Sequence, residues 1–197
     1  MRRLITLVTA VFLILTVTSC TRDSGGVLSY QSSVTGAEVR VKSGTAEYSA
    51  IVTLDRDIPE DDTVYRKSSI EITSPAEIAG VRFSFEGNTA QIHCGDTSSP
   101  LADTAARAVY RIIRSLSLRD GELCGAGDGI SGGGDTRSFR FECAEKDGQV
   151  SYDLTLDDDG RPTCAVIDGD GEDLRVDFVK LYMESADAGT TSPDINE

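Results

Sequence analysis

The residues best suited to chemistry are His93, the one histidine of the chain, and its neighbour Cys94. A His–Cys pair can act as base and nucleophile when the two side chains meet. Here they follow Ile92 in a run that alternates apolar and polar residues, so they point to opposite faces of a strand. An outward histidine needs partners that the sequence does not place. We therefore expect a non-enzymatic protein, with a hydrolase built on unrecognised carboxylates as the alternative.

An acidic run near the C-terminus has the spacing of a calcium loop. Asp168, Asp170 and Glu172 stand at every second position, as oxygen ligands do in that motif. The sixth position is Asp173 where glycine is needed, and the twelfth is Val179 where glutamate is needed. A hairpin turn explains the same residues, so we expect no metal and no cofactor.

Cysteine spacing is uninformative about metals, because none of the cysteines forms a CxxC pair. Strand alternation predicts that Cys94 and Cys143 face the core. One or two disulfides are compatible with export, and so are free cysteines that act as small apolar residues. The sequence leaves both states open for four residues: Cys94, Cys124, Cys143 and Cys164.

The N-terminus has the pattern of a bacterial lipoprotein. Arg2 and Arg3 precede an uncharged apolar run, Leu4 to Thr18, that is shorter than the roughly 20 residues of a spanning helix. This predicts a signal peptide over residues 1–19. The stretch Val17–Cys20 is similar to a lipobox, in which the cysteine is acylated and becomes the new N-terminus. An ordinary secretory signal with an incidental cysteine is the alternative.

Acylation of Cys20 would place the protein outside the cytoplasm, anchored to the bacterial cell membrane. A diacylglyceryl group brings two acyl chains, which suffice for a stable anchor. Residues 20–27 would form the lipidated tether, 28–183 a single domain, and 184–197 a disordered acidic tail.

The chain is strongly acidic, with a net charge of −14 that becomes −16 when Arg2 and Arg3 leave with the signal. Such a charge repels nucleic acid and anionic lipid head groups. Membrane contact is therefore expected through the anchor alone, and no nucleic-acid partner is expected.

One helix is predicted, at about residues 99–117. Its apolar residues recur at steps of three and four, as on one helical face: Leu101, Ala105, Ala108, Val109, Ile112 and Leu116. Three arginines fall on the other side: Arg107, Arg111 and Arg114. Ser99 would cap the start and Pro100 would occupy the first turn, while Asp103 and the late arginines suit the helix dipole.

Most of the remaining domain alternates with a period of two, which predicts strands. They centre on Val39, Ala50, Ile70, Phe83, Ile92, Phe141, Tyr152, the pair Cys164 and Val166, and Val176. Residues 27–34 have no clear period and suit a short helix or strand. The stretch Arg119–Asp135 holds seven glycines without a lysine and is predicted to be a surface loop.

Two short stretches and the order of elements carry a family resemblance. SPAEIAGVRFSFEGN, at Ser74 to Asn88, and DDDGRPT, at Asp157 to Thr163, are similar to stretches of small clostridial-type lipoproteins. With the lipobox, the central helix and the closing meander, the chain resembles the lipoprotein-carrier superfamily of LolA, LolB, LppX and LprG. The resemblance implies an α+β, mostly β fold: a strongly curved antiparallel sheet, an incomplete barrel, wrapped around the helix.

The resemblance also implies an apolar cavity for acyl chains between sheet and helix. Its candidate lining is Phe83, Phe85, Ile92, Val109, Ile112, Leu116, Phe139, Phe141 and Phe178. Close packing of the same residues would instead make a filled core, as in a cell-envelope interaction or sensor domain without a ligand. The expected function is thus a membrane-anchored lipoprotein that binds a lipid or another apolar ligand, with the filled core as the alternative.

Overall fold

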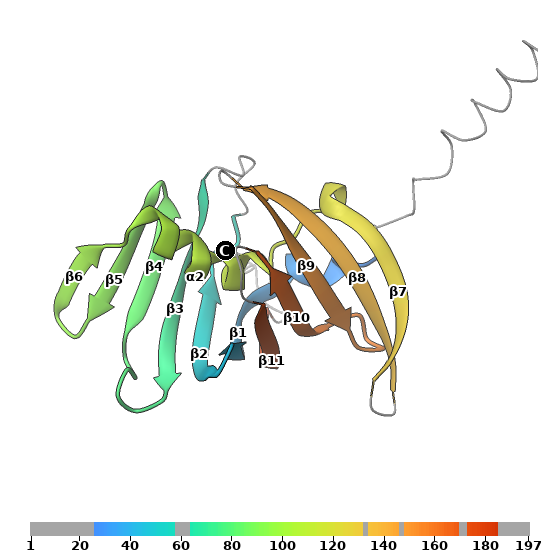
Figure 1. The fold of residues 1–197 in the computed structure, drawn as a ribbon, viewed down its shortest axis with the longest axis horizontal. Helices are drawn as coiled ribbons and strands as arrows, with labels where there is room; N and C mark the ends of the chain where they lie inside the picture. The colour runs from blue at the N-terminus through green and yellow to red at the C-terminus, as the bar shows by residue number, and fades with distance from the viewer. Residues whose placement is uncertain (1–25, 58–63, 132–133, 146–147, 170–172, 185–197) are drawn as a thin grey trace, which may run out of the picture.

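A computed structural model describes residues 26–57, 64–131, 134–145, 148–169 and 173–184 (Figure 1). The predicted signal peptide, Cys20 and the tail from residue 185 lie outside these residues and stay predictions. Within the described ranges, every helix is too short or too polar to cross a bilayer.

The elements follow one another as a β meander, a helix and a second meander. They are η1 (Ser29–Ser32), β1 (Val34–Ser43), β2 (Ala46–Leu54), β3 (Tyr65–Ser74), β4 (Arg82–Gly87), β5 (Thr89–Cys94), β6 (Thr97–Pro100), α2 (Asp103–Arg114), η2 (Asp120–Glu122), β7 (Leu123–Ser131), β8 (Gly134–Glu145), β9 (Gly148–Leu156), β10 (Pro162–Asp168) and β11 (Leu174–Met183).

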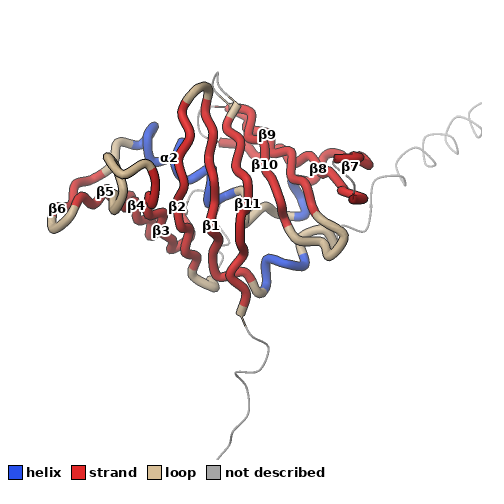
Figure 2. Tube along the Cα trace, turned by 90° about the horizontal axis from the view of Figure 1, so that it is seen from below, coloured by secondary structure: helices blue, strands red, loops and turns tan. Residues whose placement is uncertain are grey.

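All eleven described strands belong to one antiparallel sheet, in the order β6-β5-β4-β3-β2-β1-β11-β10-β9-β8-β7. The first and last strands meet in the middle, because β1 pairs with both β2 and β11. The edges β6 and β7 are not paired with each other within the described residues, so the sheet stays open and curved (Figures 1 and 2). This confirms the predicted mostly β class with one main helix.

This strand order decides where the helix lies. β6 and β7 are consecutive strands of the chain but stand at opposite edges of the sheet. The connection between them must therefore span the sheet, and α2 does so across the concave side (Figure 1). The helix consequently touches both halves of the sheet.

Alternation separates the two faces of each strand. On β1, Ala37, Val39 and Val41 are buried on the face of the sheet that carries the helix. The residues between them face outward. Val39 stands between Ala50 of β2 and Phe178 of β11 in the pairing register. The core is therefore continuous across the middle of the sheet.

The helix is shorter than predicted at its N-terminal end. Residues Thr97–Pro100 form the edge strand β6, in which Ser99 pairs with Ile92 instead of capping a helix. The N-cap position is Ala102, which offers no side-chain cap. Pairing with β5 satisfies backbone groups of this segment, which outweighs the local preference of Ser-Pro for a helix start.

The buried face of α2 also differs from the predicted stripe. Ala105 and Ala108 are exposed, while Ala106 and Ile113 are buried beside Ile112. The reason is the curvature of the sheet, since a helix that lies in a concave surface buries side chains toward both halves. The buried face at the C-terminal end of the helix is therefore wider than the predicted apolar stripe, because it includes Ile113.

Two strand predictions were wrong. The glycine-rich stretch predicted as a loop contains the edge strand β7, which is ordered by pairing with β8. On β10 the buried residues are Ala165 and Ile167 rather than Cys164 and Val166. An irregularity in pairing between Pro162 and Cys164 shifts the phase, because a bulge adds one residue and reverses the faces after it.

Truncation of Ile113, the α2 side chain at the centre of the core, should destabilise the whole domain. Ile113 is fully buried, so Ile113→Ala is expected to lower the free energy of unfolding by about 2–5 kcal/mol. Val179→Ala, at a residue 60% exposed on β11, is the control and should change it by less than about 0.5 kcal/mol. Urea denaturation measures both values, and equal effects would contradict this account of the core.

Candidate functional site

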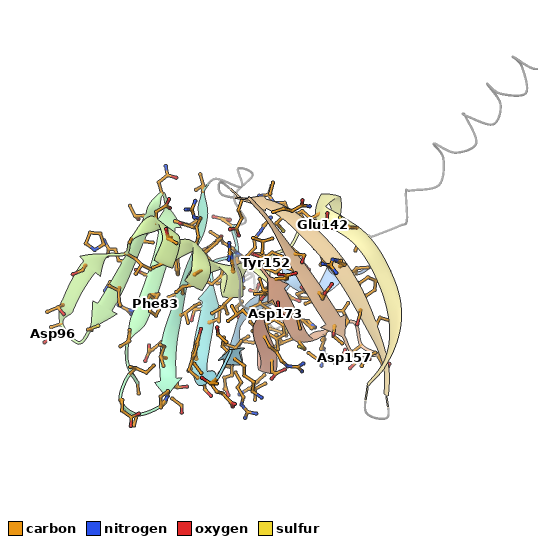
Figure 3. All side chains as sticks on the ribbon, in the orientation of Figure 1. Phe83, Asp96, Glu142, Tyr152, Asp157 and Asp173 are labelled. Atoms are coloured by element: carbon orange, nitrogen blue, oxygen red, sulfur yellow. The ribbon has the colours of Figure 1, made fainter. Side chains whose placement is uncertain are left out.

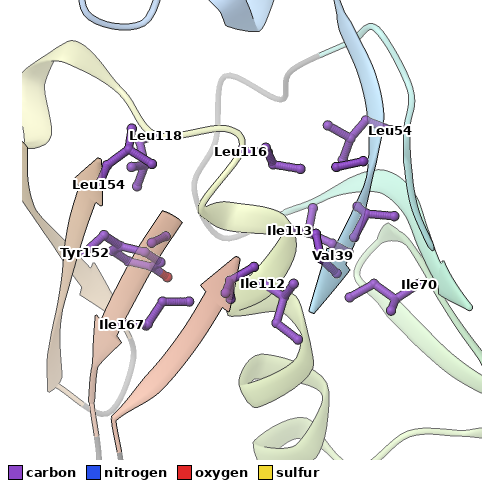
Figure 4. Packing of buried hydrophobic residues seen from close by; sticks show 14 of the residues in the cluster. Val39, Leu54, Ile70, Ile112, Ile113, Leu116, Leu118, Tyr152, Leu154 and Ile167 are labelled. Atoms are coloured by element: carbon purple, nitrogen blue, oxygen red, sulfur yellow. The ribbon is translucent and has the colours of Figure 1, made fainter. Parts of the chain in front are cut away.

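The concave side of the sheet and the face of α2 that covers it form the candidate site. At its centre the C-terminal half of the helix is wedged between the two halves of the sheet (Figure 4). Ile112, Ile113 and Leu116 come from this part of the chain, and Val39 and Tyr152 face them from either half. All five are at most 1% exposed. The centre is therefore a packed core.

An aromatic cluster joins the helix to the β3–β4 half of the sheet. Tyr110 of α2 lies against Tyr65 and Phe85, with ring centroids 4.7 and 5.3 Å away, and Tyr65 and Phe85 are 5.4 Å apart. Tilted and edge-on contacts of this kind add to the stability that burial alone provides. The cluster fixes the middle of the helix over β3 and β4.

Ion pairs join the helix to the other half of the sheet. Arg111 donates from Nη2 to Glu145 at 2.8 Å, with 16% and 20% of the two side chains exposed. Arg114 pairs with Glu122 of η2 and also donates to the carbonyl of Ser117. The arginines lie away from the apolar stripe, as predicted, but these two face the second meander rather than open solvent.

The predicted lining residues fall into two groups. Phe85, Ile112, Leu116 and Phe141 are at most 1% exposed and belong to the packed core. Four others pack against that core while part of their surface stays open: Phe83, Val109, Phe139 and Phe178. Ile92 is also partly exposed. An apolar surface thus continues outward from the core on both halves of the concave side.

A buried arginine is the feature that the sequence analysis missed. Arg66 of β3 is 2% exposed and is the largest of the fully buried side chains. Its Nε donates to the Asp55 carbonyl at 2.7 Å, and its backbone N–H donates to the Tyr110 hydroxyl at 2.8 Å. Its Nη1 has no hydrogen-bond partner. Alternation with Ser68, Ile70 and Ile72 was the available signal, since β3 extends back to Tyr65.

Tyr152 is a second buried polar group on the concave side. Its ring is fully buried on β9, and its hydroxyl has no partner. Burial is the main cause that raises the pKa of this phenol well above its ordinary value. The interior is therefore apolar with isolated hydrogen-bonding groups, whereas Asp96, Glu142 and Asp157 stand around the outside of the sheet (Figure 3).

His93 faces outward, as predicted, but it has a partner that the sequence did not indicate. Its Nε2 lies 2.8 Å from the hydroxyl of Ser84 on the neighbouring strand. Ser84 also lines a groove of about 380 Å³ along β2–β5, together with Thr53 and Gln91. No acidic side chain in the described part of the chain hydrogen-bonds to His93, so the pair lacks the third group that orients a catalytic histidine.

Metal ligands do not gather in the described ranges, where no three His, Cys, Asp or Glu side chains are placed to hold an ion. Asp170 to Glu172 of the calcium-like run lie outside those ranges.

The cysteines are free and differ in environment. Cys143 is buried, as predicted, but Cys94 is exposed, because it ends β5 near the edge of the sheet. Burial raises the pKa of the Cys143 thiol to about 12, and that of Cys164 to about 11.

Comparison with known proteins found no matching family model and no matching curated protein. Solved structures do match. LppX from Mycobacterium tuberculosis is 12% identical, with 81% of this chain and 96% of that chain covered and a TM-score of 0.41. LprF from Mycobacterium bovis is 12% identical, with coverages of 80% and 90% and a TM-score of 0.42. A LolA superfamily protein from Nitrosomonas europaea is 14% identical, with coverages of 79% and 87% and a TM-score of 0.39.

One of these three neighbours is described as a LolA superfamily protein. All three TM-scores lie below 0.5. We therefore base the functional proposal on this chain's own residues.

Thiol labelling should separate the cysteines by environment. Because only the thiolate reacts, Cys143, with its raised pKa and buried sulfur, should stay unmodified in the folded protein at neutral pH. Exposed Cys94 should react readily with a maleimide. Peptide mass spectrometry before and after unfolding in urea gives the readout, and labelling of Cys143 at the rate of Cys94 in the folded protein would contradict the assigned burial.

Proposed function

We propose that this chain is a membrane-anchored bacterial lipoprotein that binds a lipid or another apolar ligand between the concave side of its sheet and α2, without catalysing a reaction. The observation that supports this is the apolar surface beyond the packed core. Phe83 on β4, Ile92 on β5 and Val109 in the middle of α2 remain partly exposed. Apolar surface in a concave setting is typical of ligand sites.

The packed centre limits where such a ligand binds. Ile112, Ile113 and Leu116 fill the space between helix and sheet, so an alkyl chain would lie under the N-terminal half of α2. There the helix presents small side chains, Ala105 and Ala108, that are exposed. Covering apolar surface with a ligand contributes about 25 cal/mol per Å² removed from water.

Anchorage would serve this function by keeping the domain next to a lipid source. An acylated Cys20 holds the protein at the outer side of the cell membrane through two chains, while the net charge of −14 keeps the domain itself off anionic head groups. Residues 20–27 would then connect the anchor to the domain.

A second candidate is an envelope interaction or sensor domain with a filled core. The complete burial of the central side chains favours it, as does the acidic exterior. This alternative predicts no co-purifying lipid and a partner bound through charge.

Ligand binding is tested with the full-length chain carrying Cys20→Ala, so that no acyl chain of its own can occupy the site. Purified without detergent, it should carry co-purifying amphiphiles in native mass spectra and displace a neutral fluorescent alkyl probe from solution. Phe83→Ala should weaken probe binding by about tenfold, the effect of roughly 50 Å² of lost apolar contact.

Ile51→Ala is the matched control, because Ile51 is 36% exposed on the outer face of β2; it should bind like the parent. A clean mass with no probe uptake would instead favour the filled core.

Anchorage is tested by fractionation. In cells fed an alkyne-labelled palmitate, the unaltered chain should incorporate label and sediment with membranes. The variant with Cys20→Ala should incorporate none and appear in the soluble or secreted fraction, while Cys94→Ala should behave like the unaltered chain. Equal labelling of all three would show that Cys20 is not the acylation site.

A further inference from the structure

Arg66 has an environment that an apolar ligand alone does not explain. It is the one charged side chain among the fully buried residues of the described chain, where the other buried polar side chains are Ser68, Ser115 and Ser117. A guanidinium keeps its charge at any physiological pH. Burial lowers the pKa of Arg66 from its ordinary value, which expresses the cost of holding this cation away from water.

Its hydrogen-bond partners are neutral, although the nearby Asp55 carboxylate stabilises the charge without forming an ion pair. Nε binds the backbone carbonyl of Asp55, and the neighbouring Tyr110 hydroxyl accepts from the backbone N–H of Arg66 rather than from its guanidinium. Nη1, which is buried, is without a hydrogen-bond partner. Arg111 and Arg114, by contrast, each reach a carboxylate within the same concave side, at Glu145 and Glu122. Arg66, although more deeply buried than either, forms no ion pair with a carboxylate of the described residues.

Arg66 also stands beside the proposed apolar surface. Tyr110, which contacts Arg66, follows Val109 on α2, and Phe85, which packs on Tyr110, lies two residues from Phe83 on β4. A ligand chain lying on Phe83 and Val109 therefore ends within a residue or two of the aromatic cluster that adjoins the guanidinium.

We propose that the ligand is an anionic amphiphile whose carboxylate or phosphate pairs with Arg66 while its alkyl chain covers Phe83 and Val109. This rests on the proposed function, because it assigns the head-group chemistry of the same site. Arginine suits both anions, since its planar fork donates two parallel hydrogen bonds to a carboxylate or a phosphate. A neutral lipid would leave the buried cation unpaired.

Three ligands with the same alkyl chain separate the head-group contribution: palmitate, hexadecyl phosphate and hexadecanol. Binding of each to the full-length chain with Cys20→Ala is measured at mildly alkaline pH by displacement of a neutral fluorescent probe. The two anions are kept below their critical micelle concentrations and hexadecanol below its solubility limit. At least one anionic ligand should bind about tenfold or more tightly than hexadecanol, as expected for a charge-assisted pair. The anion that shows the larger preference identifies the source as a fatty acid or a phospholipid.

Arg66→Met removes the charge and keeps an unbranched apolar side chain. It should abolish the preference for the anion and leave hexadecanol binding unchanged or tighter. Arg66→Lys should retain part of the preference. Arg82→Met is the control, since Arg82 is exposed on the outer face of β4, and it should keep the full preference.

The outcomes distinguish the two proposals. Failure to bind any of the three ligands would overturn the proposed function, and this inference with it. Binding without an anionic preference in the unaltered Arg66 protein would overturn this inference alone, even if Arg66→Met does not fold. An anionic preference that survives in folded Arg66→Met would assign it to other groups and equally overturn the role of Arg66.

Discussion

The passage of the chain from one edge of the open sheet to the other is the constraint on which the rest of this structure depends. β6 and β7 are neighbours in sequence and the two ends of the sheet in space. A helix joins them, and it lies across the concave side of the sheet (Figure 1), where Ala106, Ile112 and Ile113 are buried. The curvature of the sheet then brings both halves against one helix, so a single short element contributes to the core of the entire domain.

Two kinds of interaction hold the C-terminal half of the helix in place, and the N-terminal half is less enclosed. Toward β3 and β4 the contact is aromatic, through Tyr110. Toward β8 and η2 it is electrostatic, through Arg111 and Arg114. Both contacts belong to the C-terminal half of α2, as does the packed wedge around Ile113. The N-terminal half covers β4 and β5 with small side chains, and this is where apolar residues of the sheet stay partly open.

Much of the fold followed from local pattern, and the errors have identifiable tertiary causes. Strands with one buried face can be recognised from the sequence, as around Val39 and Tyr152, because every second residue is buried and apolar. The edge strand β7 showed no such pattern, since its order comes from backbone pairing with β8. The buried face of β10 was predicted wrongly because the pairing is irregular between Pro162 and Cys164, and the sequence pattern does not reveal this irregularity. Of the candidate site, the aromatic lining was visible in sequence, but its division into packed and open residues depends on where the helix lies.

Arg66 could not be found by hydrophobic patterning, because it breaks the pattern. An apolar residue at that position would complete the alternation of β3, and replacement of a buried charge by an apolar side chain of similar volume is commonly neutral or stabilising. For the fold itself, the guanidinium contributes a single hydrogen bond, from Nε to the Asp55 carbonyl. What it adds is a fixed positive charge inside an apolar surface, at a point where only its Nε is used. Sites at which a local rule fails without a structural gain are the sites where function is to be sought. On that ground Arg66, rather than the aromatic residues around it, is expected to decide which ligands this protein accepts.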